Sequence, residues 1–157
     1  MFHVVLYQPE IPPNTGNVIR LCANTGCQLH LIRPLGFAID HAKMRRAGLD
    51  YHEFAKLNVH DDMAGFIDAA KPARLFALST RGRQRYDAVR YASGDAFVFG
   101  PETRGLPQPL LDALPPTHCL RLPMQPHNRS LNLSNTVAIV VFEAWRQNDF
   151  VGAADTF

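Results

Sequence analysis

Residues 119–142 read CLRLPMQPHNRSLNLSNTVAIVVF, in which a short apolar run, a polar loop and a longer apolar segment follow one another. The first run, His118–Leu122, has the length and composition of a strand. The last segment, Val137–Arg146, carries valine and alanine at helical spacing and predicts an amphipathic helix. We therefore expect a strand, a polar loop and a closing helix in this part of the chain.

The loop between these two segments is rich in hydrogen-bonding side chains. Serine and asparagine can cap a helix by accepting hydrogen bonds from its free N–H groups, and Ser134 or a neighbour is expected to do so. Capping explains one or two of these residues and leaves the others, so we expect the loop to hold a polar ligand against exposed backbone. The polar residues are Asn128, Arg129, Ser130, Asn132, Ser134 and Asn135.

The composition is that of an ordinary globular domain. Of the 157 residues, 46% are hydrophobic and 19% are charged, so a single domain over residues 1–157 is expected. There is no run of about 18 apolar residues and no basic start of a signal peptide, so we expect no membrane span and no secretion. Cys22, Cys27 and Cys119 lack metal-type spacing, which favours a reduced, cytoplasmic environment.

Strands alternate with helices along the chain, which predicts an α/β fold with a mainly parallel sheet flanked by helices. The expected strands are Phe2–Gln8, Gln28–Ile32, Phe54–Val59, Arg74–Ser79, Asp95–Gly100 and His118–Leu122. The expected helices are Thr15–Asn24 with a stop at Gly26, Asp40–Gly48, Asp61–Lys71, Pro107–Leu114 and Val137–Arg146.

Three expected strands end in a similar way. Each passes from an apolar run to glycine, proline or small polar residues, at Leu78, Gly100 and Leu122. Ligands of parallel sheets bind at the carboxyl ends of strands, and Gly100 permits the close approach of a ligand. Ordinary strand ends show the same pattern about as often, so it indicates a site only together with other signals.

Motifs of several common enzyme classes do not occur in the sequence. There is no G-x-G-x-x-G after a strand and no G-x-x-x-x-G-K-[ST], which argues against a dinucleotide dehydrogenase and a P-loop enzyme. The histidines are scattered without an H-E-x-x-H pattern, so no metal site is expected. Ser130 has His127 close in sequence, but it does not stand in a nucleophile elbow, and a loop contact explains this spacing better than a hydrolytic triad.

Arginine dominates the basic residues. Lysine occurs only at positions 43, 56 and 71 among the 16 basic residues, and the net charge is +2. Arginine suits bidentate contacts to phosphate. Arg81–Arg85 follows a strand end and is a candidate phosphate clamp, and Lys43–Arg46 forms a second basic cluster. A solvated charged face explains both clusters equally well, so the residue types leave nucleic-acid binding open.

Two further charged residues are candidates for a site. Arg20 lies on the first expected helix, where an arginine ordinarily extends into solvent. Glu102 lies in the tight segment GPETRGLP, residues 100–107, together with Arg104. Glu102 and Arg104 form either a structural ion pair or part of a site. We expect Glu102 to shape its loop and also to face the ligand.

Three segments together resemble motifs one, two and three of the SPOUT class of RNA 2′-O-methyltransferases. They are Asn14–Arg20 (NTGNVIR), Phe99–Pro107 (FGPETRGLP) and Asn128–Ser134 (NRSLNLS). Their order and spacing also fit that class, and the resemblance covers nearly the whole chain. It implies an α/β sheet with a deep trefoil knot in its C-terminal part, an exception to the rule against threaded loops.

The resemblance also implies a cofactor and a second subunit. S-adenosylmethionine would be held by backbone at Leu78, Gly100 and Leu122 and by Ser130, with S-adenosylhomocysteine as the product. The protein would be a homodimer, in which Arg20 of one subunit reaches the pocket of the other.

Catalytic roles follow from the same resemblance. Arg20 would act on the ribose 2′-OH, Ser130 and Asn132 would orient the substrate, and Asn14 and Glu102 would support the site. The shortest members of the family carry no RNA-binding extension and act on the wobble nucleotide 34, a cytidine or a modified uridine, of leucine tRNAs. We expect the same of this chain. The alternatives are the ribose of another tRNA or of ribosomal RNA, or a non-catalytic RNA- or nucleotide-binding module.

Overall fold

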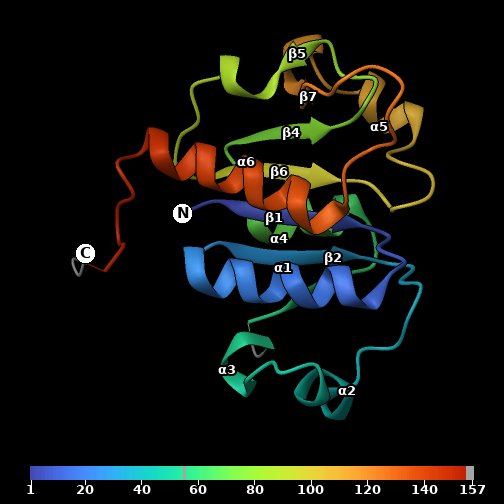
Figure 1. Ribbon diagram of the computed structural model, residues 1–157, viewed down its shortest axis with the longest axis vertical. Helices are drawn as coiled ribbons and strands as arrows, with labels where there is room; N and C mark the ends of the chain where they lie inside the picture. The colour runs from blue at the N-terminus through green and yellow to red at the C-terminus, as the bar shows by residue number, and fades with distance from the viewer. Residues whose placement is uncertain (55, 155–157) are drawn as a thin grey trace.

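A sheet of 7 strands in the order β3-β2-β1-β6-β4-β7-β5 forms the centre of the computed structural model, which describes residues 1–54 and 56–154 (Figure 1). All strand pairs are parallel, so the predicted class is confirmed. The strands are β1 (His3–Tyr7), β2 (Gln28–Ile32), β3 (Asn58–His60), β4 (Arg74–Leu78), β5 (Gln84–Arg85), β6 (Asp95–Phe99) and β7 (Cys119–Arg121). The helices are α1 (Pro12–Thr25), α2 (His41–Arg46), α3 (Tyr51–Phe54), α4 (Met63–Ala70), α5 (Gln108–Asp112) and α6 (Leu133–Gln147), with the short 3-10 helices η1 (Tyr86–Ala88) and η2 (Pro116–His118).

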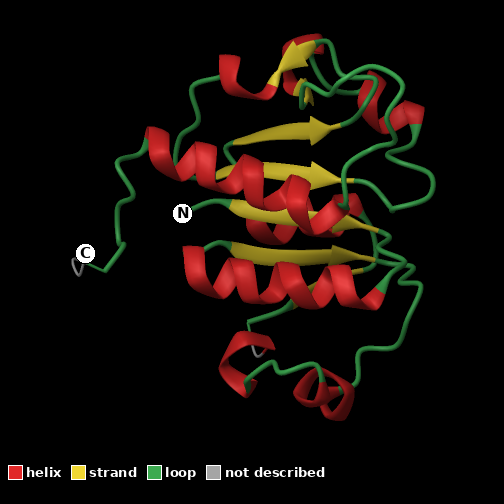
Figure 2. Ribbon diagram, viewed as in Figure 1, coloured by secondary structure: helices red, strands yellow, loops and turns green. Residues whose placement is uncertain are grey.

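Helices cover both faces of the sheet (Figures 1 and 2). Helices α1 and α6 lie side by side on one face, whereas α4 and α5 pack on the other. Neighbouring residues of β1 therefore belong to different cores: Val4 and Leu6 face α1 and α6, and Val5 faces α4. A strand buried on both faces needs apolar residues at consecutive positions, which explains the apolar start of the chain. Among the described residues, no helix combines the length and the apolar character that spanning a membrane requires.

Helix α1 begins earlier than the sequence pattern predicts. It starts at Pro12 rather than at Thr15, because the first turn of a helix tolerates proline, whose missing N–H is not needed there. The predicted stop at Gly26 is confirmed. This residue has φ 74°, a left-handed conformation that glycine adopts without a steric penalty.

The predicted strand over Phe54–Val59 is only partly correct. Residues 51–54 form the short helix α3, and only Asn58–His60 pairs with β2, while Ala55 lies outside the described residues. Phe54 is buried in the core beside α1. The apolar signal at this position therefore reflects real burial, but the burial comes from a helical turn.

Strand β7 lies between β4 and β5, although only residues 79–83 join those two strands. The joining segment crosses very close to β7. A Cβ atom on Gly82 would lie 2.4 Å from the carbonyl oxygen of Leu120, so only glycine fits there. The insertion of β7 under this crossing is compatible with the deep trefoil knot expected from the resemblance, and the knot itself stays a prediction.

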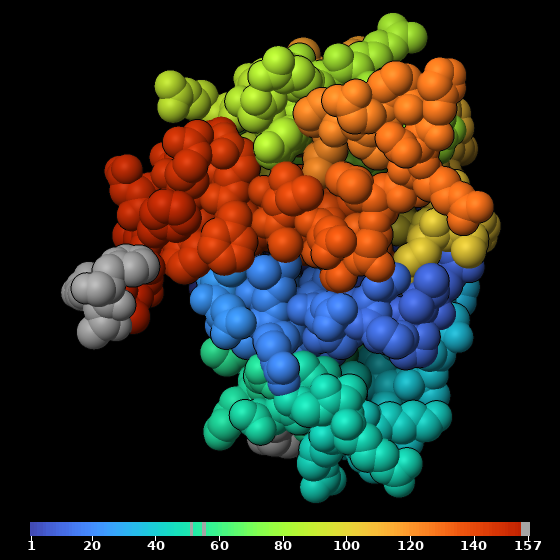
Figure 3. All heavy atoms as spheres, viewed as in Figure 1, coloured from blue at the N-terminus to red at the C-terminus, as the bar shows by residue number. Residues whose placement is uncertain are grey.

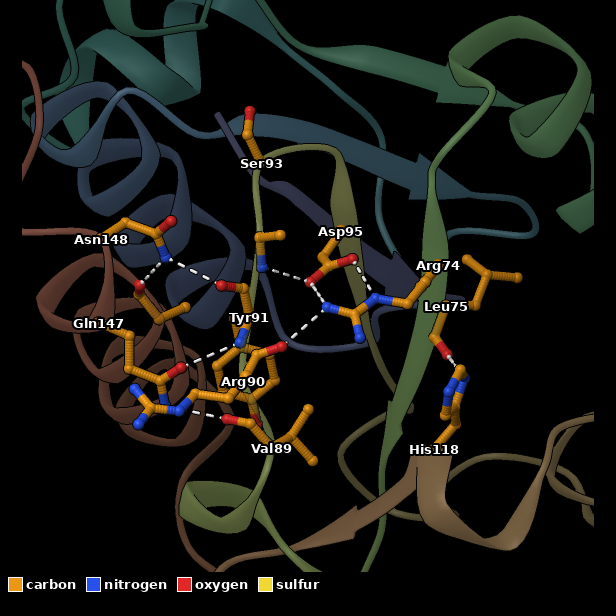
Figure 4. A network of polar contacts seen from close by, with 12 residues as sticks. Arg74, Leu75, Val89, Arg90, Tyr91, Ser93, Asp95, His118, Gln147 and Asn148 are labelled. Carbon is orange, nitrogen blue, oxygen red and sulfur yellow. Dashed lines mark hydrogen bonds and ion pairs between the residues drawn. The ribbon is translucent and has the colours of Figure 1, made fainter.

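A polar network at the amino edge of the sheet fastens α6 to the segment before β6 (Figure 4). The fully buried carboxylate of Asp95 accepts two hydrogen bonds from Arg74, at 2.8 and 2.7 Å. Gln147 accepts a hydrogen bond from the backbone N–H of Tyr91 at 2.9 Å, and Asn148 donates one to the carbonyl oxygen of Tyr91 at 3.1 Å. The carboxyl end of α6 is therefore held by side chains of its own last turn.

Three histidines form a hydrogen-bonded row across β1, β2 and β3. The ring nitrogens of His30 lie 3.0 Å from Nδ1 of His3 and 2.9 Å from Nε2 of His60, and Phe66 packs edge-on against His30. Each contact needs one N–H donor and one bare nitrogen, so three neutral rings complete the row. Burial, and then the neighbouring His3 and His60, lower the pKa of His30 to about 3. Within the described residues, no group of three or more histidine, cysteine, aspartate or glutamate side chains is arranged to hold a metal ion.

We expect acid to weaken the fold through His30. Its folded-state pKa lies below its ordinary value of 6.5, so its contribution to stability is complete above pH 6.5 and is lost as the pH falls toward 3. Below pH 6.5 the free energy of unfolding should fall by about 1.4 kcal/mol per pH unit from this residue. Urea unfolding at several pH values between about 7 and 5 measures the slope. His30→Leu should flatten it, and an equally steep slope in that variant would contradict the assignment to His30.

Candidate functional site

A cavity of about 500 Å³ opens at the carboxyl edge of the sheet, beside the ends of β4, β6 and β7. The register pairs Leu78 with Phe99 on one side and with Leu120 on the other, so the three strands end at one level. The carboxyl edge of a parallel sheet is where ligand sites form, and this volume is typical of such sites.

Every residue to which the family resemblance assigns a role in the site lines this cavity, with the exception of Arg20. The three motifs, which are far apart in the sequence, are therefore brought together by the fold. The predicted residues around the cavity are Asn14, Leu78, Gly100, Glu102, Leu122, Ser130 and Asn132.

Gly100 is required by the shape of its own loop. A Cβ atom on Gly100 would lie 2.4 Å from the backbone nitrogen of Leu106 and 2.9 Å from the Cα atom of Gly105. The loop after β6 therefore folds back onto the end of the strand, which no larger residue would allow. From the sequence we expected this glycine to admit a ligand, whereas here it admits the returning loop that forms one wall of the cavity.

Glu102 joins this returning loop to the start of α1. Its carboxylate accepts hydrogen bonds from the backbone N–H groups of Glu10 at 2.8 Å and Ile11 at 3.1 Å. In return, Glu10 accepts hydrogen bonds from the hydroxyl of Thr103 at 2.8 Å and from its backbone N–H at 3.1 Å. These bonds from Thr103 lower the pKa of the Glu10 carboxyl. Glu102 thus has the contacts expected of a residue that shapes its loop.

Asn132 caps α6 and uses both ends of its amide. Its Oδ1 accepts hydrogen bonds from the backbone N–H groups of Ser134 at 2.9 Å and Asn135 at 3.3 Å, and its Nδ2 donates to Oδ1 of Asn14 at 3.0 Å. The cap expected at Ser134 or a neighbour is therefore formed by Asn132, to which Ser134 also donates its hydroxyl. Nδ2 of Asn14 lies 3.5 Å from Glu102. A row of polar contacts through Glu102, Asn14 and Asn132 links the three motifs.

Arg20 lies apart from this cavity, on the outer side of α1. Its Nε lies 3.3 Å from a carboxylate oxygen of Glu53, and its guanidinium also donates to the carbonyl oxygen of Gly48. The Arg20 side chain is 51% exposed. A single chain therefore does not bring Arg20 to Ser130.

Two polar residues that the sequence patterns did not single out, Arg121 and Thr136, also line the cavity, as does Arg104. Arg104 donates to the side chain of Gln8 at 3.3 Å, so in the described part of the chain it does not form the ion pair with Glu102 that the sequence left open. Arg121 is the last residue of β7, and Thr136 lies in the first turn of α6. Neither residue type marks a site by itself, so these two could be found only once the strand register was known.

The candidate phosphate clamp at Arg81–Arg85 is not one cluster. Arg81 lines the cavity and donates to the carbonyl oxygen of Leu106. Arg85 belongs to β5 rather than to the predicted loop, and it pairs with Asp87 at 2.6 Å. The end of this segment is therefore engaged within the chain, and Arg81 is the arginine that it contributes to the site.

The fold and the site define an α/β protein whose ligand cavity is built from three sequence motifs at the carboxyl edge of a parallel sheet. Residues 1–142 match the SpoU rRNA Methylase family. The chain belongs to this family.

Three similar proteins indicate which members of the family this chain resembles. A protein of Burkholderia cenocepacia (strain HI2424) is 65% identical over 156 residues, which cover 98% of this chain and 100% of that protein. A protein of Escherichia coli (strain K12) is 59% identical over 153 residues, with 98% of each chain covered. Both are named tRNA (cytidine(34)-2′-O)-methyltransferase. A solved structure that concerns the 2-OH methylation of C/U34 on tRNA is 48% identical, with a TM-score of 0.86 over 95% of this chain and 97% of that one.

Proposed function

We propose that this protein is a tRNA 2′-O-methyltransferase that transfers a methyl group from S-adenosylmethionine to the ribose of nucleotide 34. The observation that carries the proposal is the single cavity at which all three motifs meet. The names of relatives at 59% and 65% identity over nearly the whole chain supply the substrate and the position.

The cavity fits S-adenosylmethionine in size and in chemistry. Its volume of about 500 Å³ lies within the range of cofactor sites. Buried Leu78 and Leu122 give it apolar walls, and the adjoining strand ends carry backbone groups that can bond to the edge of an adenine. Backbone at Leu78, Gly100 and Leu122, together with Ser130, would hold the cofactor. The cofactor supplies a methyl group on a sulfonium and leaves as S-adenosylhomocysteine.

Methyl transfer requires in-line placement of the ribose 2′-oxygen and loss of its proton. We assign to Arg20 the stabilisation of the negative charge that develops on this oxygen. A guanidinium stays protonated at neutral pH and is a poor base, but it is an effective donor to an oxyanion. Ser130 would orient the ribose. Asn132, which also lines the cavity, would help to orient it, with its amide held in place as the cap of α6.

The proposed chemistry needs a second copy of the chain, because Arg20 and the cavity are apart in one copy. Helices α1 and α6 form a continuous face (Figure 3). Ile139 and Phe142 of α6 are exposed, as are Ile11 and Leu131 at the rim of the cavity. Burial of these apolar side chains against a symmetric copy would stabilise a homodimer. In such a dimer, Arg20 of each subunit would reach the cavity of its partner.

The finer proposal concerns the substrate. We infer that the wobble cytidine or modified uridine of leucine tRNAs is methylated, in the cytoplasm, where tRNA is used. The support is the resemblance of the chain to the shortest members of the family and its coverage of 100% of the relative from Burkholderia cenocepacia.

Incubation with tritiated S-adenosylmethionine is expected to label bulk tRNA, and nucleoside mass spectrometry should place the methyl group on the 2′-oxygen of nucleotide 34. Ribosomal RNA is the matched control, because the family is described by that substrate. Label in ribosomal RNA alone would contradict the proposed substrate. A protein that binds the cofactor and labels neither RNA would favour a non-catalytic RNA-binding module.

A further inference from the structure

A second cavity, of about 460 Å³, lies between α1 and residues 37–49. It shares no lining residue with the candidate cofactor cavity. In Figure 3, α1 runs between α6 and the segment that contains α2 and α3. The two cavities therefore lie on different sides of α1, and of the residues that line the second only Arg20 has a role in the proposed function.

The walls of this second cavity suit a flat, largely apolar group. Phe37 and Met44 line it and are half-buried, and the exposed Ala47 lies at its edge. Aromatic side chains stack on nucleobases of any sequence, and the methionine thioether packs well against aromatic rings.

The helical wall also carries an unpaired polar atom. Thr15 lines the cavity and is 2% exposed, and its Oγ1 is the one buried side-chain oxygen or nitrogen in the described residues that has no hydrogen-bond partner. Helical threonine occupies two rotamers, and rotation between them would let the hydroxyl meet a polar edge of an occupant. An occupant with both a flat apolar face and hydrogen-bonding edges is therefore favoured over a purely apolar one.

Cationic side chains line the second cavity and continue beside it on α2. Arg20 and Lys43 line it, and Arg45 and Arg46 follow Lys43 on α2, all of them exposed. The acidic residue in the lining, Asp40, is used to cap α2. Cations around an apolar, aromatic-lined pocket are typical of sites for single-stranded nucleic acid, where phosphates meet the cations and a base stacks inside.

We propose that the second cavity binds one unpaired nucleobase of the substrate RNA, with Lys43, Arg45 and Arg46 on the adjoining phosphates. This inference rests on the proposed function for the identity of the RNA. It adds a specificity site, because a base held beside Arg20 of one subunit would fix which ribose enters the cofactor cavity of the partner subunit. An apolar pocket of this kind offers few contacts to a free inorganic anion. Binding of such an anion by charge alone would therefore leave the apolar walls of the cavity unexplained.

The test fills the cavity and measures RNA affinity. Ala47→Phe places a ring at the edge of the cavity, and Phe37→Ala removes the stacking wall. Each variant should raise the Kd for an anticodon stem-loop, measured by fluorescence anisotropy, about tenfold or more. The affinity for S-adenosylmethionine, measured by calorimetry, should stay within about twofold, because neither residue lines the cofactor cavity.

Ala42→Phe is the matched control, since Ala42 is an exposed alanine of α2, the helix that Ala47 follows, and does not line the cavity. It should leave both affinities unchanged. A stem-loop with 4-thiouridine at position 34 or at a neighbouring position should cross-link, under long-wavelength light, to the peptide that contains Phe37 or Met44.

Three results would overturn the inference. The first is unchanged RNA affinity in both cavity variants, and the second is a cross-link confined to other peptides. The third is a change of oligomeric state in Ala47→Phe, seen by sedimentation, which would show that a second copy of the chain covers the cavity. RNA affinity is read without methyl transfer, so these outcomes stay distinguishable from failure of the proposed function. If RNA binding depends on the cavity but no methyl group is transferred, the nucleobase site is supported and the proposed methyltransferase activity is contradicted.

Discussion

Replacement of Arg20 with alanine is expected to lower kcat for tRNA methylation by about 10²- to 10³-fold, the usual effect of removing one donor to a developing oxyanion. The affinity for S-adenosylmethionine should not change, because Arg20 does not line the cofactor cavity. Stability should change little, since Arg20 is 51% exposed and its bond to Glu53 is a surface ion pair. Single-turnover kinetics with saturating cofactor measure the effect on the chemical step.

A matched control separates this effect from the general loss of a surface arginine. Arg33 is 55% exposed and pairs with Asp61 at 2.9 Å, much as Arg20 pairs with Glu53. Arg33→Ala should keep kcat within about twofold. Arg20→Lys keeps the charge and loses the planar fork of donors. Near-normal turnover in Arg20→Lys would contradict a role that depends on guanidinium geometry.

Mixed dimers test whether Arg20 acts on the partner. Ser130→Trp should block the cofactor cavity from an exposed position, without a change in the core. An equal mixture of Arg20→Ala and Ser130→Trp subunits, after exchange, should regain about a quarter of the wild-type activity, because half of the dimers then contain one intact composite site. A mixture that stays inactive would contradict action across the interface.

The position of the candidate site could be predicted because it depends on where the strands end, and strand ends can be recognised from the residue types. Leu78 and Leu122 end apolar runs, and parallel strands must end at the same edge. The register then aligns them without any further information from side chains. Gly100 was found by the same pattern, although the backbone that approaches it closely belongs to its own loop.

The use of individual side chains could not be predicted in the same way. Asn132 lines the cavity, as its expected role near the substrate requires, but its amide also caps α6 and bonds to Asn14, a residue of the first motif. An asparagine suits a cap and a ligand contact equally well, and only the tertiary contact with a distant segment shows the partners of its amide. The second cavity was missed for a similar reason, since its walls come from α1 and from residues 37–49, and neither segment shows it alone.

Arg74→Met is expected to lower the free energy of unfolding by up to about 3–5 kcal/mol, the usual cost of leaving a buried charge without its partner, because Asp95 is fully buried although Arg74 itself is 38% exposed. Asp95 is fully buried and Arg74 supplies two of its hydrogen bonds. Methionine keeps most of the packing of the arginine stem against Phe76, over which the guanidinium lies at 5.0 Å. The loss is a large share of the roughly 5–15 kcal/mol that stabilises a typical domain. Urea unfolding at one fixed protein concentration measures it, because dimer formation would make stability depend on concentration.

The chain contains a matched pair at the surface. Arg85 binds Asp87 through the same two-point contact, at 2.9 and 2.6 Å, but its side chain is 70% exposed. Arg85→Met should therefore cost much less than Arg74→Met, since water replaces the lost partner. Equal costs for the two substitutions would show that burial of Asp95 is not the cause. Arg74→Met combined with Asp95→Asn should recover most of the loss, because the double variant has no buried charge left unpaired. The network at the amino edge of the sheet would then stabilise the protein mainly by keeping Asp95 paired, and only secondarily by the attraction between its charges.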